Sequence, residues 1–326
     1  MPPKIRGMAA NLTPQASASR RFTLMISGED AVDPGLEQNE PPKGLPHERF
    51  LLGDLLPIAP VLLIGQSDLV IKPNEIIACL QPVHFHATRD HLILMAQSQI
   101  NLTENESAKL LQAALPFIEE DFGSKVLFQG KRDWFIPAGP FASLATHSID
   151  QAHGRNIDWW MPRDTNEPGI AKLWRKLQNE IQMLWHIDPV NEMRERNGLP
   201  SINSLWINGI GKLVDIQIPQ LLKNVNQMYG DHPLLAGLAK YIGISRQNQI
   251  DFSNLNNAFA WLDRPESSWN DLRRALLSNE LDEIEIIDFP KGKARHRIFR
   301  AKDLNKKSWA FWKKSEPLTW KEMIAT

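Results

Sequence analysis

The sequence predicts an α/β fold: a mixed sheet with flanking helices. Segments with the period of a helix alternate with short β-branched runs along most of the 326 residues. Its 42% hydrophobic and 23% charged residues are typical of a globular protein. We expect a single α/β domain over 21–318, with a subdivision allowed near 150–170. Residues 1–20 should form a poorly ordered N-terminus, and residues 319–326 a C-terminal tail.

The N-terminal part is expected to consist mainly of strands. The run RFTLMIS predicts a first strand, and an acidic, proline-rich loop follows at 29–47. A helical turn and an apolar segment are expected over 48–65. Residues 67–97 are rich in β-branched residues, with turn signals between them, and predict two or three strands.

A long helix and a hairpin come next. Thr103 and Glu106 have the spacing of a capping box, and Gly123 can end the helix that they begin. The run KVLFQGKRDWFIPA then predicts a hairpin. A turn-rich connector, SIDQAHGRNIDWWMP, leads from there to the central part of the chain.

The central part combines an apolar helix face with many amides. At 100° per residue, an apolar stripe from Trp174 to Trp185 predicts an amphipathic helix over 174–187. Asp188 as N-cap before a proline predicts a second helix, which Gly198 ends. The run SINSLWI is the expected next strand.

The C-terminal part predicts two helical segments and a hairpin. The helical segments fall at about 216–243 and 267–280, and the strands LDEIEIIDF and ARHRIFRA flank the turn PKGK. In an antiparallel hairpin the acidic residues of the first strand would lie near the arginines of the second. Cross-strand charge pairing would then explain both charged runs without a bound partner.

Neutral amides beside the 174–187 helix provide the main candidate site. Amides can bind neutral or anionic ligands, or they can satisfy the backbone of a neighbouring loop, and the sequence leaves both readings open. An arginine beside an amide in the turn HGRN suits an anion, or else it ties down the loop. The candidate ligand-binding residues are Arg155, Asn156, Gln178, Asn179, Gln182, Asn191, Arg194, Asn203 and Ser204.

The run HFHATRDH offers an alternative metal site. His84, Asp90 and His91 are its candidate ligands, although the spacing differs from the metallo-β-lactamase pattern. The other reading is that these histidines lie on a half-buried strand with local hydrogen bonds. We therefore expect no cofactor, and a divalent metal only under the alternative.

The charge balance argues against nucleic acid as a partner. The net charge is -1, and once the hairpin charges are paired only NKKSWAFWKK at 305–314 remains basic. WINGIGK lacks the spacing of a phosphate-binding loop. Cys79 is the only cysteine, and no apolar run is long enough to cross a membrane. These features favour a cytoplasmic protein.

Several motifs together resemble a known family. LPHERF, PVHFHATRDHLILM, HGRNIDWWMP, the block Leu177–Gly211 and WAFWKKSEPL are similar to the RpfE-like regulatory protein family of proteobacteria. Its members are often labelled cofactor-independent phosphoglycerate mutases. The resemblance covers roughly 45–318 and implies a cytoplasmic, regulatory-type protein on a diverged alkaline-phosphatase-like scaffold. That label also implies an Asp at the end of the first strand and later Asp and His metal ligands. In this sequence Ser27 occupies the position of that Asp, and the later ligand motif is absent, GDHP at 230–233 being only weakly similar to it.

Three functions follow as hypotheses. The first is a protein that binds a small anionic metabolite or a protein partner without turnover. The alternatives are a metal-dependent phosphotransfer enzyme of the phosphoglycerate mutase type and a nucleic-acid-binding regulator.

Overall fold

The computed structural model of the chain describes residues 19–30, 44–95, 97–304 and 319–325. Three expectations therefore fall largely outside the described residues. They concern the N-terminus at 1–20, the acidic loop at 29–47 and the basic, tryptophan-rich run at 305–314.

The larger of two main sheets is mixed, as predicted. It has six strands in the order β12-β11-β1-β10-β8-β9. Five of them are parallel, and β12 pairs with β11 in the antiparallel sense. The strands are β1 (Arg21–Met25), β8 (Gln227–Tyr229), β9 (Ser245–Gln247), β10 (Ala258–Trp261), β11 (Glu283–Asp288) and β12 (Arg295–Phe299).

Helices cover both faces of the larger sheet. On one face, α1 (Pro46–Leu52), α2 (Ile58–Gln66) and α8 (Pro233–Ile242) share an apolar core with the sheet. On the other face, the core includes α9 (Glu266–Leu277) and α10 (Trp320–Ala325). The segment expected to be a C-terminal tail thus contributes Trp320 and Met323 to a buried cluster.

The smaller sheet is built by residues 77–211, between β1 and β8 in the chain. It is antiparallel, in the order β5-β6-β2-β7. Its strands are β2 (Ile77–Val83), β5 (Phe128–Gln129), β6 (Trp134–Pro137) and β7 (Ser204–Gly211), and β3 (Phe85–Ala87) with β4 (Leu92–Leu94) forms a separate hairpin.

Two long helices cover the outer face of the smaller sheet, where their apolar sides pack. The α-helices within residues 77–211 are α3 (Gln97–Ile100), α4 (Glu104–Phe122), α5 (Ile149–Ala152), α6 (Ile170–His186) and α7 (Pro189–Arg196), and α5 packs in a separate cluster with Trp206. Short 3-10 helices lie at Gly139–Ser143, Ile157–Trp159, Leu213–Asp215, Gln220–Asn224, Pro290–Gly292 and Ala301–Asp303.

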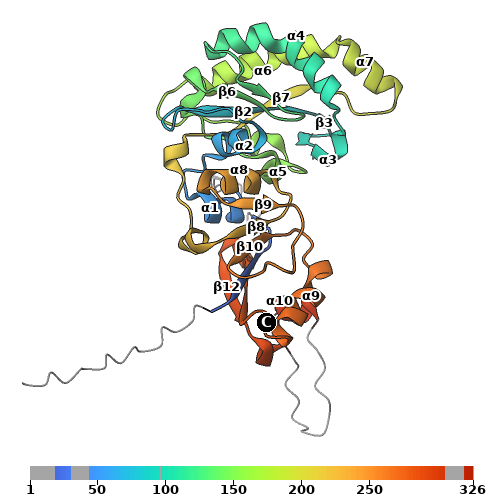
Figure 1. Cartoon of the computed structure of the whole chain (residues 1–326). Coiled ribbons are helices and arrows are strands. Elements are labelled where there is room, and N and C mark those ends of the chain that lie inside the picture. The colour runs from blue at the N-terminus through green and yellow to red at the C-terminus, as the bar shows by residue number, and fades with distance from the viewer. Residues whose placement is uncertain (1–18, 31–43, 96, 305–318, 326) are drawn as a thin grey trace, which may run out of the picture.

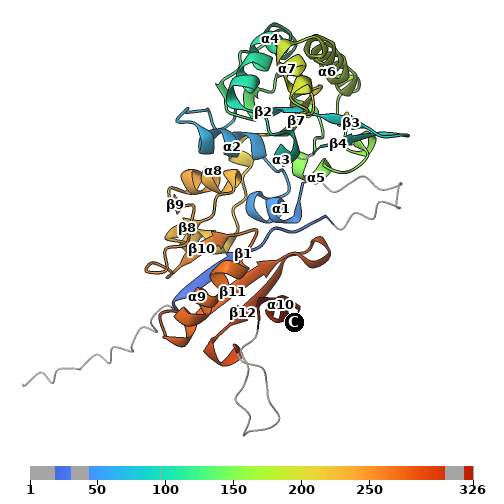
Figure 2. The same ribbon diagram turned by 90° about the vertical axis from the view of Figure 1, so that its right-hand side faces the viewer.

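The layers are stacked, and α2 and α8 lie between the two sheets (Figures 1 and 2). These two helices touch through glycines. A Cβ on Gly65 would lie 2.6 Å from the amide nitrogen of Gly237, and a Cβ on Gly237 would lie 1.9 Å from the carbonyl oxygen of Val61. The contact between the layers therefore depends on the absence of side chains at this crossing.

Most of the local predictions are confirmed. Thr103 and Glu106 form the capping box of α4, and Gly123 ends that helix in the left-handed conformation. Asp188 caps α7. The hairpins β5–β6 and β11–β12 form where they were expected.

The helical segment predicted at 216–243 is largely wrong. The structure has two 3-10 turns, the strand β8 and only then the helix α8. The three residues of β8 are all buried, and a buried run this short has no periodicity that separates strand from helix. Strand β7 also continues through the run NGIG, to Gly211.

Candidate functional site

A cavity of about 430 Å³ lies where three parallel strands of the larger sheet end. Ser27 follows β1, Asp263 follows β10 and His232 follows β8, and all three line the cavity. Its opposite wall comes from α1 and from residues 150–155. Ligands of open parallel sheets bind at this edge of the sheet. We call this cavity the strand-end cleft.

Ser27 is held by two hydrogen bonds at the base of the cleft. Its Oγ donates to Asp263 Oδ1 at 2.8 Å and accepts from Trp261 Nε1 at 2.9 Å. Trp261 is buried, so its N–H needs an acceptor. The serine hydroxyl therefore links the ends of β1 and β10.

Two histidines flank Trp261. The His232 ring stacks on it with centroids 3.7 Å apart, and the His47 ring meets it edge-on at 5.1 Å. Leu234 N donates to His232 Nδ1 at 3.2 Å, so the neutral ring of His232 carries its hydrogen on Nε2. Burial, with His232 as the next cause, lowers the pKa of His47 to about 4, and burial also lowers the pKa of His232. Both rings are predominantly neutral at pH 7.

Carboxyl groups surround these rings. Glu48 is 5% exposed, and its Oε2 accepts from Leu45 N at 2.6 Å in the first turn of α1. Burial, together with Asp150 and Asp30, raises the pKa of Glu48 to about 7. Asp30 Oδ2 accepts from Gln151 Nε2 at 2.7 Å, whereas Asp30 Oδ1 is buried without a partner among the described residues.

The cleft is richer in acidic than in basic side chains. Four carboxylates line it: Glu29, Asp30, Asp150 and Asp263. Arg155 is the one arginine or lysine among the described lining residues. It lies over Trp160, with the guanidinium carbon 4.9 Å from the ring centroid. Stacking of this kind leaves the in-plane N–H groups of an arginine able to bind an acceptor.

The structure divides the predicted ligand-binding residues among several places. Arg155 lies in the strand-end cleft. Asn156 instead caps a 3-10 helix, since its Oδ1 accepts from Asp158 N at 3.0 Å. Ser204 is buried in β7, and its hydroxyl has no partner among the described residues.

The buried amides mostly satisfy backbone groups. Gln178 Nε2 donates to Leu205 O at 2.7 Å. Asn191 bonds to both Ile202 N and Ile202 O, at 2.7 and 2.8 Å. This is the backbone-satisfying reading that the sequence left open.

Arg194 and Asn203 have similar roles. Arg194 is buried, donating to Pro200 O at 2.7 Å and to Glu106 Oε1 at 3.0 Å. Asn203 bonds to both Phe85 N and Phe85 O, at 2.7 and 3.0 Å. These contacts hold loops against the smaller sheet.

Asn179 and Gln182 are exposed on α6. With Asn191 and Asn203 they line a separate open groove of about 900 Å³ along α6 and α7. The predicted residues therefore do not converge on a single site, because Arg155 lines the strand-end cleft and four amides line this groove.

The alternative metal ligands are not assembled. His84 Nδ1 lies 2.6 Å from Ser201 O, and the ring centroids of His84 and His86 are 6.0 Å apart. Within the part of the chain that the structure describes, no group of three or more His, Cys, Asp and Glu side chains could hold a metal ion. The candidate ligands His84, Asp90 and His91 are therefore not part of such a group.

The cleft contains residues that the sequence reasoning did not select, chiefly His47, Asp150 and Asp263. The usable signal was positional, because polar residues lie two or three positions after the ends of β1, β8 and β10. That signal needed β8 and β10 to be recognised as parallel strands beside β1, and neither was predicted.

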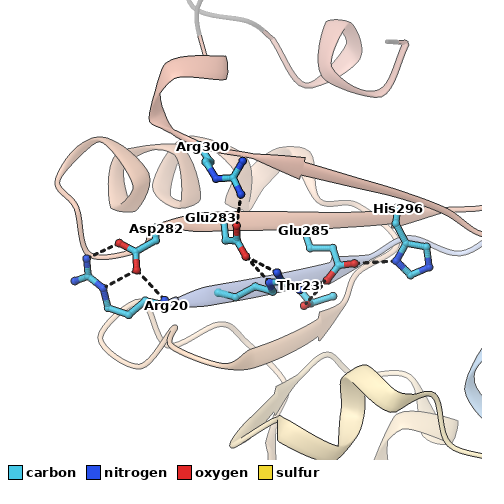
Figure 3. A network of polar contacts seen from close by, with 8 residues as sticks. Arg20, Thr23, Asp282, Glu283, Glu285, His296 and Arg300 are labelled. Carbon is cyan, nitrogen blue, oxygen red and sulfur yellow. Dashed lines mark hydrogen bonds and ion pairs between the residues drawn. The ribbon is translucent and has the colours of Figure 1, made fainter. Parts of the chain in front are cut away.

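The charged C-terminal hairpin pairs internally in part, as predicted, but Asp282 pairs with Arg20, just before β1, at 2.8 Å (Figure 3). Glu283 and Glu285 also pair with Arg21 of β1. Asp288 binds Arg295 at 2.6 Å and Arg297 at 3.0 Å. Glu283 binds Arg300 at 3.0 Å, and Glu285 Oε1 lies 2.8 Å from His296 Nδ1. The run at 305–314 lies outside the described residues.

Comparisons with known proteins find similarity to solved structures. None of the helices that the structure describes is both long and apolar enough to cross a membrane. No protein-family model matches the chain, and no curated protein matches it. One similar solved structure is a cofactor-independent phosphoglycerate mutase from Thermoplasma acidophilum, at 13% identity, with 86% of this chain and 90% of that chain covered and a TM-score of 0.35. Another is the PH0037 protein from Pyrococcus horikoshii, at 12% identity, with 88% and 90% covered and a TM-score of 0.42. The alkaline-phosphatase-like scaffold stays a prediction.

Proposed function

We propose that this chain is a cytoplasmic, regulatory-type protein, similar to the RpfE-like family, that binds a small anionic metabolite in the strand-end cleft without turnover. The observation that carries the proposal is the position of Arg155 and His232 on the same cavity at the ends of parallel strands. Arg155 supplies guanidinium N–H groups, and His232 supplies an Nε2–H because its Nδ1 is already an acceptor.

Binding without turnover is favoured by the state of Ser27. Trp261 already donates to the oxygen of this hydroxyl, and Asp263 already accepts its hydrogen. A serine nucleophile is normally activated by a base, most often a histidine, that takes its proton. Here the hydrogen goes to a carboxylate and one of the two lone pairs accepts from Trp261, so the hydroxyl serves to join two strand ends.

A second candidate is a metal-dependent phosphotransfer enzyme of the cofactor-independent phosphoglycerate mutase type. The four carboxylates of the cleft favour it, because carboxylate oxygens are the ligands of hard divalent cations. The buried, unpartnered Asp30 Oδ1 is one oxygen that a cation could use. The fit is incomplete, since the described residues provide no group of three metal ligands, and we assign no reaction step to a metal.

A protein partner would use a different surface. The groove along α6 and α7 has the exposed apolar residues Met183 and Ile187 beside its amides. Apolar side chains rimmed by polar groups are typical of interaction sites. This form of the proposal places recognition outside the strand-end cleft.

A thermal-shift screen against phosphorylated metabolites, with and without Mn²⁺, tests the cleft. A ligand at one hundred times its Kd stabilises the folded state by about 2.7 kcal/mol. We expect the Arg155→Ala variant to lose this shift, and the Arg175→Ala variant, changed at an exposed site on α6, to keep it. An equal shift in Arg155→Ala and wild type would refute the assigned site. Turnover of 3-phosphoglycerate with Mn²⁺ would favour the enzyme instead.

A further inference from the structure

A second, smaller cavity lies beside the strand-end cleft. Its volume is about 120 Å³, and it shares Asp150 and His232 with the cleft. Its polar wall includes Glu48, Asp133 and Asn208, and its other wall is apolar, formed largely by α2 and the start of α8. We call this cavity the inner chamber.

Hydrogen bonds fix the orientation of the amides in the inner chamber. Gln66 Nε2 donates to Asp133 Oδ2 at 2.7 Å, and Gln81 Nε2 donates to Asp133 Oδ1 at 2.6 Å. Because a carboxylate only accepts, Gln81 must turn its Nε2 toward Asp133 and its Oε1 away. Asn208 then donates through Nδ2 to Gln81 Oε1, at 2.6 Å. Since Asn208 uses its Nδ2 in this chain of bonds, its carbonyl oxygen Oδ1 remains to accept a further hydrogen bond.

That carbonyl oxygen is an acceptor without a donor. Asn208 is 3% exposed, lines the inner chamber, and accepts no side-chain hydrogen bond from any residue that the structure describes. A polar atom on a side chain this buried normally has a protein, water or ligand partner. Because Asn208 lines the inner chamber, we infer that the partner comes from the cavity.

Most of the other polar groups of the inner chamber are also acceptors, whereas His232 contributes an Nε2–H donor. Asp133 and Asp150 carry carboxyl groups, and Glu48 adds a third. The amide and hydroxyl donors already have acceptors: Gln81 donates to Asp133, and Ser148 to Glu48. Burial raises the pKa of Asp133 as well as that of Glu48, so a cation in the inner chamber would stabilise the ionised form of both carboxyls.

We propose that the inner chamber binds a protonated amine, either a free ammonium ion or the primary ammonium group of a small ligand. An ammonium group brings one positive charge and several donors but no acceptor, which matches a wall of carboxyls and a carbonyl oxygen. The apolar wall around Leu62 and Pro233 suits a carbon attached to the nitrogen. This inference goes beyond the anion proposed for the strand-end cleft and does not depend on it.

The test is the melting temperature of the full chain in four chloride salts at equal ionic strength: ammonium, methylammonium, tetramethylammonium and potassium. We expect a saturable rise with ammonium or methylammonium, and none with tetramethylammonium, which has no N–H donor. A rise with ammonium alone identifies the free ion, and a rise with methylammonium identifies the amine of a ligand. Equal melting temperatures in all four salts, or an equal rise with potassium, would overturn the proposal.

A variant and a direct measurement complete the test. Replacing Asn208 by Leu removes the acceptor, and we expect about tenfold weaker binding of ammonium or methylammonium, since hydrogen bonds to charged groups are strong. The control is Asn256→Leu, at an exposed position outside the inner chamber. Unchanged affinity in Asn208→Leu would contradict the assignment. For the wild type, ¹⁵N-labelled ammonium or methylammonium should give N–H proton signals protected from exchange, and their absence at saturating concentration would also overturn it.

Discussion

Glu48 provides a stability test of the acidic centre of the molecule. It is 5% exposed, and its pKa is raised from 4.5 to about 7, mainly by burial. Between these two pH values the folded state holds a proton that the unfolded chain has released. Stability must therefore fall as the pH rises through this window, and the full cost is present above pH 7. The separation of the two pKa values corresponds to about 3 kcal/mol.

The perturbation is Glu48→Gln. Glutamine has no charge to bury, and its Oε1 can still accept from Leu45 N, so the first turn of α1 keeps its side-chain cap. We expect the free energy of unfolding of the variant, relative to wild type, to rise by about 2–3 kcal/mol between pH 5 and pH 8. Asp133, whose pKa is also raised, affects both proteins alike and cancels in this difference. The repulsion between Asp30 and Glu48 is part of the raised pKa of Glu48 and is removed with its charge.

Urea unfolding followed by tryptophan fluorescence at several pH values measures this difference. Glu104→Gln, at an exposed position in the first turn of α4, is the control, and its difference from wild type should change little. If the curves of Glu48→Gln and wild type stay parallel from pH 5 to pH 8, then Glu48 is not a buried, titrating carboxyl and the reasoning fails.

Three further changes test the packing. Gly237→Ala should lower the unfolding free energy by about 1–3 kcal/mol, because its Cβ would meet the carbonyl oxygen of Val61, and an unchanged urea midpoint would contradict this. Arg194→Met should cost about 2–4 kcal/mol, since it leaves buried backbone carbonyls without their donor and removes the ion pair with Glu106; a loss below 1 kcal/mol by thermal or urea unfolding would count against these contacts of the buried Arg194. Thr103→Ala should cost about 1 kcal/mol by removing the α4 cap, again measured by urea unfolding, and no loss would mean that the cap is not formed in solution.

The sequence predicted those features whose signals are local. Thr103 and Glu106 are three residues apart, and Asp188 directly precedes the proline that begins α7, so each helix start is encoded in a few neighbouring positions. The hairpin β11–β12 was equally accessible, because its complementary charges are close in the chain. Such features depend on one turn or on one pair of adjacent strands.

The strand-end cleft depends on pairing between distant segments. Ser27 and Asp263 are separated by 236 residues, and only the parallel pairing of β1 with β10 brings them together. Strand β10 has four residues and β8 has three, all buried, so neither has the alternation that identifies a strand with one exposed face. A reading of the sequence that misses these two strands therefore cannot place Ser27 next to Asp263.

The amides of the central block have a structural cause that the sequence could not show. Strand β7 is the edge of the smaller sheet, and Leu205 lies opposite Pro82, which has no N–H to donate. Gln178 reaches from α6 to donate to Leu205 O.

Asn191 and Asn203 also bond to backbone groups near the start of β7. The Asn191 amide bonds to the N–H and the carbonyl of Ile202, and the Asn203 amide bonds to the N–H and the carbonyl of Phe85. Buried amides suit such backbone groups because each carries a donor and an acceptor without a charge. Their density beside an apolar helix therefore reflects irregular backbone around the start of β7, and the strand-end cleft lies at the other sheet.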